Sequence, residues 1–196
     1  MRQQSESKVN TLELKSGYIK QFLRDKQVAS IMPSSNFSVR CIKRKINFKK
    51  SKVIVEYGPG TGVFSEMLLK NLKADAKLIL FETNPDFTKI LNEKFGKDHR
   101  VHIVKESALK VTNVLHRLKI KEVDYVITGI PFTFLTPKQR LKLIDRSHQV
   151  LKKGGKLISY QFSLTVNKYV KRQFDKFNIS VQPLNIPPLL IIEGIK

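Results

Sequence analysis

The sequence predicts an α/β fold, with a mostly parallel sheet of seven strands and helices on both of its faces. Three observations carry this prediction. Short apolar runs alternate with amphipathic segments from Lys52 onward, a glycine-rich turn follows the first run, and two apolar runs close the chain with no helix between them. Alternation of strand and helix is typical of a parallel sheet wound on both faces. A closing strand pair is typical of an antiparallel addition at the edge of the sheet.

Seven apolar runs are predicted to be strands. They cover residues 53–57, 78–82, 101–104, 123–128, 156–163, 179–184 and 189–194. Apolar side chains recur at helical spacing between these runs. The helices predicted from that spacing cover residues 63–72, 85–95, 108–118, 137–152 and 165–176. Asn84 and Pro85 are a typical helix start, and Gly154-Gly155 is expected to end the helix that begins at Pro137.

Residues 1–51 are predicted to form a basic helical extension, and residues 52–196 the α/β domain. The extension is expected to contact a membrane or to cover the ligand site of that domain. Residues 11–28 combine an apolar stripe with a basic face, and residues 37–48 are expected to form a short basic helix. For residues 11–28, the alternative to a membrane contact is that the stripe packs on the α/β domain. Thirteen Lys/Arg and three Asp/Glu in residues 1–52 give a net charge of +10, about half the total of +21.

The charge of +21, from 37 Lys/Arg and 16 Asp/Glu, favours an anionic partner, either a membrane surface or a nucleic acid. The alternative to an anionic partner is that the lysines only form solvated faces of the protein. A single cysteine excludes an intramolecular disulfide, and the four histidines show no ligand spacing, so no metal site is expected. Neither a signal peptide nor a run of about 18 apolar residues is visible. We therefore expect a cytoplasmic protein, or one peripheral at a membrane face.

The strongest functional signal is VIVEYGPGTGVF at residues 53–64. Glycines let a backbone turn sharply and approach a ligand, and the helix N-terminus that follows favours an anionic group. The spacing E-x-G-x-G-x-G differs from the dinucleotide pattern G-x-G-x-x-G. It resembles the first motif of methyltransferases that use S-adenosylmethionine. The residues of this segment expected to bind that cofactor are Glu56, Gly58, Pro59, Gly60 and Gly62.

Two further strand ends are expected to contact the cofactor. Glu82, followed by Thr83 and Asn84, ends the second strand, where a carboxylate can accept hydrogen bonds from both ribose hydroxyls. An ordinary charge at a strand end is the alternative. Ser107 and Ala108 follow the third strand, where this class of enzyme places a group near adenine. Ser107 stands where an Asp is common.

The segment Thr128-Gly129-Ile130-Pro131-Phe132 ends the fourth strand, where such enzymes bring the acceptor amine to the methyl group. Amino methyltransferases that act on bases carry an Asn or Asp here, before a Pro and an aromatic residue. Its side-chain oxygen accepts a hydrogen bond from the amino group and aligns the lone pair. Because Gly129 stands at that position, methylation of a base would lack its usual orienting group. A plain strand-to-loop turn is the alternative.

Six segments resemble the small bacterial phospholipid N-methyltransferases, which belong to the Rossmann-like class I methyltransferases. They are residues 27–37, 55–69, 81–87, 128–132, 154–163 and 185–191. The resemblance implies S-adenosylmethionine as donor, a phospholipid substrate, and stepwise methylation of phosphatidylethanolamine toward phosphatidylcholine. It also implies peripheral binding at the anionic inner face of the cell membrane, and a place beside the cofactor for Ser34 and Ser35. A more distant resemblance is to the ribosomal RNA adenine dimethyltransferases.

The headgroup pocket is expected to be lined by Tyr18, Tyr160, Gly129, Pro131 and Phe132. Amphipathic packing is the alternative for the two tyrosines. The phospholipid enzymes carry a Tyr where this chain has Phe162, two residues after Tyr160.

Two other functions compete with lipid methylation. One is an RNA adenine methyltransferase, which the charge also suits. Gly129 argues against it, and no RNA-binding domain is expected after Lys196. The other is a binding module without catalysis, against which the glycine loop and Glu82 argue.

Overall fold

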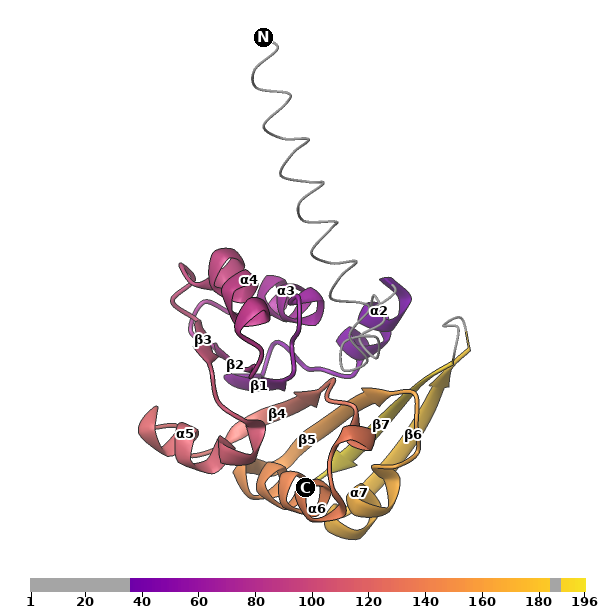
Figure 1. Ribbon diagram of the computed structural model, residues 1–196. Helices are drawn as coiled ribbons and strands as arrows, with labels where there is room; N and C mark the ends of the chain where they lie inside the picture. The colour runs from indigo at the N-terminus through magenta and orange to yellow at the C-terminus, as the bar shows by residue number, and fades with distance from the viewer. Residues whose placement is uncertain (1–35, 184–187) are drawn as a thin grey trace. The chain divides into compact units, whose positions relative to one another are not determined.

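The computed structural model describes residues 36–183 and 188–196, which form a seven-stranded sheet in the order β3-β2-β1-β4-β5-β7-β6 (Figure 1). The strands are β1 (Val53–Tyr57), β2 (Lys77–Phe81), β3 (Val101–Val104), β4 (Val123–Thr128), β5 (Leu151–Gln161), β6 (Lys176–Gln182) and β7 (Leu189–Ile195). β7 runs antiparallel to both β5 and β6, and the other neighbouring pairs are parallel. The predicted α/β fold with an antiparallel C-terminal strand is confirmed.

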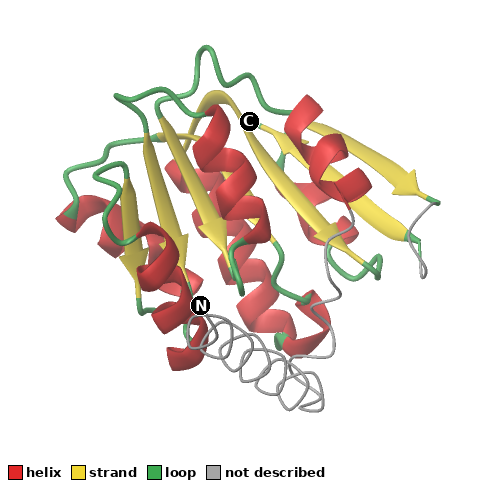
Figure 2. Cartoon of the chain, turned by 90° about the horizontal axis from the view of Figure 1, so that it is seen from above, coloured by secondary structure: helices red, strands yellow, loops and turns green. Residues whose placement is uncertain are grey.

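Helices cover both faces of this sheet, as Figure 2 shows. They are α2 (Asn36–Arg44), α3 (Val63–Asn71), α4 (Pro85–Phe95), α5 (Val111–Arg117), α6 (Pro137–Val150) and α7 (Asn167–Gln173), with short 3₁₀ turns η1 (Ala108–Lys110) and η2 (Phe132–Phe134). Successive side chains of a strand point to opposite faces. Ile54 of β1 therefore packs in the core with α2, α3 and α4, and Val55 in the core with α5, α6 and α7.

Local sequence explains where two of the helices begin. The side chain of Asn84 accepts hydrogen bonds from the Asp86 and Phe87 amides, at 2.8 and 3.3 Å, and Pro85 occupies the first helical position of α4. This start is as predicted. At α6, Thr136 and Gln139 bond each other's backbone amides in a capping box, which satisfies two amides that the helix leaves unpaired.

The predicted end of α6 at Gly154-Gly155 is wrong. The helix ends at Val150, and the chain is already extended at Leu151, where β5 begins. Leu151 is buried and pairs with Val123 of β4, so the energy of burying this side chain favours the strand immediately after the helix. The two glycines lie in an irregular stretch of β5 where its register against β4 shifts, and Gly154 has a φ of 75°. Glycine inside a strand often marks such an irregularity.

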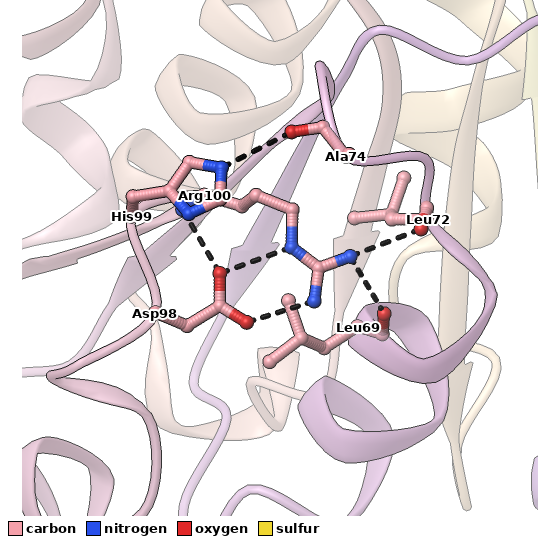
Figure 3. A network of polar contacts seen from close by, with 6 residues as sticks. All are labelled: Leu69, Leu72, Ala74, Asp98, His99 and Arg100. Atoms are coloured by element: carbon pink, nitrogen blue, oxygen red, sulfur yellow. Dashed lines mark hydrogen bonds and ion pairs between the residues drawn. The ribbon is translucent and has the colours of Figure 1, made fainter.

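Arg100, at the end of the turn before β3, fixes the C-terminal end of α3 (Figure 3). Its guanidinium donates to the carbonyl oxygens of Leu69 and Leu72, at 3.3 and 3.0 Å, and makes a two-pronged ion pair with Asp98. The last carbonyls of a helix have no partner within the helix, so a cation there stabilises its end. The anchor fixes α3, the helix that follows the glycine loop.

The predictions that involve residues 1–35, including the helix at 11–28 and the roles of Tyr18, Ser34 and Ser35, lie outside the described residues. In the part of the chain that the structure describes, no helix combines the length and the apolar character needed to cross a bilayer. The same part holds no cluster of three or more potential metal ligands.

Candidate active site

The carboxyl ends of β1, β2 and β4 bring the predicted site segments together. In the register of the sheet, Tyr57 pairs with Phe81 on one side and with Thr128 on the other. The backbone pairing continues one residue further, since the Gly58 amide donates to the Phe81 carbonyl at 2.9 Å and the Gly129 amide to the Tyr57 carbonyl at 3.1 Å. The glycine loop, the turn after β2 and the loop after β4 therefore start side by side, where sheets of this type bind ligands.

The three glycines of the loop have left-handed backbones, with φ of 66° at Gly58, 56° at Gly60 and 82° at Gly62. Side chains other than glycine rarely adopt this conformation, so the loop path requires glycine. At position 62 a second constraint also requires glycine, because a Cβ there would lie 2.7 Å from the Phe95 ring of α4. Its lack of a side chain allows α3 and α4 to approach closely.

Glu82 lies at the end of β2 with only 8% of its surface exposed, and three backbone amides hold its carboxylate. The Thr83 and Asn84 amides donate to Oε1 at 2.8 and 2.9 Å, and the Gly60 amide donates to Oε2 at 3.2 Å. The carboxylate is thereby fixed against the glycine loop. Thr83 and Asn84 contribute their amides here, while the Asn84 side chain caps α4.

Glu56 is fully buried under the same loop, and one of its oxygens lacks a partner. Oε2 accepts a hydrogen bond from the Ser65 hydroxyl at 2.6 Å, whereas Oε1 has no partner among the described residues. Burial raises the pKa of Glu56 to about 7, the nearby Glu82 carboxylate adds to the rise, and the Ser65 bond opposes it. Ser65 was not among the residues predicted from the sequence, although a serine in the first turn after a glycine loop is a visible signal.

The turn after β3 is organised by its own contacts. The Ser107 hydroxyl accepts a hydrogen bond from the Leu109 amide at 3.3 Å and caps η1, and Ala108 beside it is buried. Glu106 forms ion pairs with Lys110 and Arg117. The predicted role of Ser107 and Ala108 near adenine stays a prediction.

The loop after β4 places its residues in different surroundings. Gly129 and Pro131 are partly exposed, while the Phe132 side chain is fully buried in the core with α5, α6 and α7. Arg140 donates to the Phe132 carbonyl at 2.8 Å and holds the loop on α6. The exposed aromatic residue of this loop is Phe134, which the sequence analysis missed.

Tyr160 of β5 lies between the glycine-loop helix and the loop after β4. Its ring centroid is 4.2 Å from that of Phe64 in the first turn of α3, and its hydroxyl lies beside Gly129. Burial of the hydroxyl and the Glu56 carboxylate raise the pKa of Tyr160 well above its ordinary value. The predicted pocket residues Tyr160 and Gly129 are therefore brought together.

These residues fit S-adenosylmethionine. The unpartnered Oε1 of Glu56 is an acceptor that suits an ammonium donor, and a buried acceptor left unpaired costs free energy that such a donor removes. The fixed Glu82 carboxylate suits a pair of hydroxyls. When bound, the cofactor supplies an electrophilic methyl group on its sulfonium.

Known proteins with similar sequences are methyltransferases. The family model described as ribosomal RNA adenine dimethylase matches residues 12–153. An ornithine lipid N-methyltransferase of Singulisphaera acidiphila is 27% identical over 82% of this chain and 84% of its own length. Ribosomal RNA small subunit methyltransferase A of Borreliella afzelii is 29% identical over 66% of this chain, which spans 45% of that relative.

Solved structures share the fold at low identity. A precorrin-6y C5,15-methyltransferase of Geobacter metallireducens has a TM-score of 0.67 and 15% identity, over 88% of this chain and 93% of the other. A 1,6-didemethyltoxoflavin-N1-methyltransferase of Burkholderia thailandensis, solved with S-adenosylhomocysteine, has a TM-score of 0.65 and 11% identity, over 95% of this chain and 88% of the other. The chain therefore belongs to the ribosomal RNA adenine dimethylase family and is a class I methyltransferase that uses S-adenosylmethionine.

Proposed function

We propose that this methyltransferase transfers methyl groups to the primary amine of a phospholipid headgroup, phosphatidylethanolamine, at an anionic membrane surface. In this proposal Glu82 binds the ribose hydroxyls of the cofactor and Glu56 its ammonium group. Residues 1–51 form the basic extension that contacts the membrane or covers the cofactor. The similarity to an ornithine lipid N-methyltransferase, which extends over most of both chains, supports a lipid acceptor.

Gly129 is the observation that carries this proposal. The nitrogen lone pair of a base amine is delocalised into the ring, so an Asn or Asp oxygen is needed to align it. An alkyl amine keeps a localised lone pair once it has lost a proton, and then needs positioning and exclusion of water. A site without a side chain at position 129 suits the alkyl amine.

Exposed apolar side chains beside this loop support a lipid surface as the partner. β4 and β5 are parallel neighbours, with Thr128 paired to Ser159, so the loops after them emerge at the same edge of the sheet. Phe134 follows β4 and is 53% exposed, while Phe162 and Leu164 follow β5 and are 38% and 58% exposed. Apolar groups at the rim of a site gain free energy on contact with acyl chains.

Methylation of adenine in ribosomal RNA is the second candidate. The family model and the Borreliella relatives favour it, and a net charge of +21 suits RNA as well as an anionic membrane. The two candidates share the cofactor and differ in the acceptor.

Transfer of radiolabelled methyl groups from S-adenosylmethionine separates them. The purified full chain is offered vesicles of phosphatidylglycerol with phosphatidylethanolamine and, separately, small-subunit ribosomal RNA. We expect label in the lipid and none in the RNA. Vesicles in which phosphatidylcholine replaces phosphatidylethanolamine offer no primary amine and should stay unlabelled, as should all reactions with Glu82→Ala. Label in RNA alone would overturn the proposal.

A further inference from the structure

The Tyr160 side chain occupies the space that any side chain at position 129 would need. A Cβ built on Gly129 meets the Tyr160 hydroxyl first, and then Cζ at 2.7 Å and Cε2 at 3.0 Å. Unlike the three glycines of the loop after β1, Gly129 does not have a positive φ, so its backbone would accept other residues. The reason for glycine at this position is therefore the tyrosine, and not the turn.

Tyr160 is held firmly in this position. Its backbone lies within β5, paired with Ile191 of β7, and its ring packs against Phe64 of α3. Because a tyrosine ring has few rotatable bonds, these contacts fix the hydroxyl beside the end of β4. A polar group thus reaches the acceptor loop from the neighbouring strand.

Among the described residues, the Tyr160 hydroxyl has no hydrogen-bond partner. Within residues 36–183 and 188–196, the burial of this hydroxyl and the charge of Glu56 raise its pKa, and no hydrogen bond contributes to the shift. Since its pKa lies well above the ordinary value, the phenol stays neutral and keeps one donor and its acceptor lone pairs.

We infer that the Tyr160 hydroxyl replaces a side chain at position 129 as the polar group that accepts a hydrogen bond from the acceptor amine and orients it. The inference rests on the proposed N-methyltransferase function and names a residue that determines its specificity. The tyrosine ring fills volume beside Gly129 that an Asn would leave free for a planar base. A small alkyl amine needs less of that volume, so the pair Gly129 and Tyr160 favours the headgroup amine.

Tyr160→Phe tests this directly, because it removes the hydroxyl and keeps the ring on Phe64. We expect kcat to fall by up to about 100-fold through lost alignment. The KM for S-adenosylmethionine and the Tm should stay at the wild-type values. The matched control is Tyr169→Phe, which removes the hydroxyl of a partly buried tyrosine in α7 and should leave kcat unchanged. Wild-type kcat in Tyr160→Phe would overturn the inference.

A double-mutant cycle tests the link between the two positions. Gly129→Ala should lower kcat in the wild-type background, because the new methyl group must displace the tyrosine. In the Tyr160→Ala background the same change should have no further effect, and equal effects in both backgrounds would contradict the inference. All rates are measured on whichever acceptor the wild type labels. Label in RNA instead of lipid therefore contradicts the proposed function and the preference for the headgroup amine, but not the hydrogen bond to Tyr160. An unchanged Tyr160→Phe contradicts this inference alone.

Discussion

At the scale of single residues, two carboxylates at neighbouring strand ends have different surroundings. Glu82 is held by three backbone amides. Glu56 has one hydroxyl partner, and its second oxygen has no partner within the part of the chain that the structure describes. The sequence predicted both residues, because a motif fixes their spacing to the glycine loop. It placed Tyr160 and Gly129 in one pocket but did not predict that the tyrosine fills the space of a side chain at position 129, since that contact depends on the register of β4 and β5 and on which face of β5 a residue occupies.

The pKa of Glu56 predicts how cofactor binding depends on pH. An ammonium group binds the ionised carboxylate, so binding must remove the proton that Glu56 holds below about pH 7. We expect the affinity for S-adenosylmethionine to fall roughly fivefold from about pH 7 to about pH 6. Calorimetry in buffers of different ionisation enthalpy should detect the released proton.

Glu56→Gln is the control for this pH effect. It should bind the cofactor more weakly and lose the pH dependence between about pH 6 and about pH 7. Among the described residues, the other titratable groups that act on Glu56 are Glu82 and Tyr160, and the raised pKa of Tyr160 keeps it neutral in this range. An unchanged pH dependence in Glu56→Gln would assign the titration to another group.

The stability of the free protein depends on pH in the opposite direction to cofactor binding. Because the pKa of Glu56 is raised from 4.5 to about 7, the ionisation of this buried carboxyl lowers the free energy of unfolding as the pH rises from 4.5 toward 7.

At the scale of elements, the strands were the most predictable part of the chain. Each of the seven predicted strands overlaps an observed one. β1, β2 and β4 are buried over most of their length, and strands buried on both faces are rich in apolar residues. The exact ends were less predictable. Gly154-Gly155 has the composition of a helix end, yet the pairing of Leu151 with β4 fixes the start of β5 before it. This pairing joins Leu151 to a strand nearly 30 residues earlier in the chain, so the local sequence pattern cannot predict it.

Arg100 predicts a measurable contribution to the stability of α3. Arg100→Ala removes the donors to the Leu69 and Leu72 carbonyls and the ion pair with Asp98. We expect the free energy of unfolding to fall by about 1–2 kcal/mol, and the Tm by about 3–6 °C. Thermal unfolding followed by circular dichroism measures this, and an unchanged Tm would show that the anchor is dispensable.

Asp98→Asn separates the ion pair from the anchor, because Arg100 keeps its carbonyl partners. Its Tm should fall less than that of Arg100→Ala. The Arg100 hydrogen bonds lower the pKa of Asp98 from 3.8 to about 2. The advantage of the wild type over Asp98→Asn should therefore be complete above pH 3.8 and diminish as the pH falls toward 2.

At the scale of the whole molecule, the topology of the sheet brings the site residues to one edge. The parallel strands β1, β2, β4 and β5 all end there, and the site residues and the exposed Phe134, Phe162 and Leu164 follow those ends. The excess charge of residues 1–52 predicts attraction to an anionic surface. The sequence predicted the cofactor from one loop, but the acceptor depends on side chains from several strands.

Flotation with liposomes tests the attraction to membranes. Binding should require anionic lipid and weaken with salt, since each basic residue near the surface contributes about 1 kcal/mol. The test variant reverses four charges in residues 11–28. It changes Lys15, Lys20, Arg24 and Lys26 to Glu. Its flotation should drop strongly while the affinity for the cofactor is largely retained.

A matched control reverses four exposed lysines at the opposite, amino ends of the strands. They are Lys73, Lys77, Lys97 and Lys121. The net charge changes equally in both variants, so equal loss of flotation would show that total charge acts and residues 11–28 are no anchor. Wild-type protein that never floats would count against a lipid acceptor.

The lipids of cells that express the protein give the most direct measurement of its central activity. Mass spectrometry of extracts from a host that lacks methylated phospholipids should show phosphatidylethanolamine with one, two and three added methyl groups. Cells expressing Glu82→Ala should show none of these species. An unchanged lipid profile with active, folded wild-type protein, together with new dimethyladenine in the ribosomal RNA, would contradict the account and identify the protein as an RNA methyltransferase.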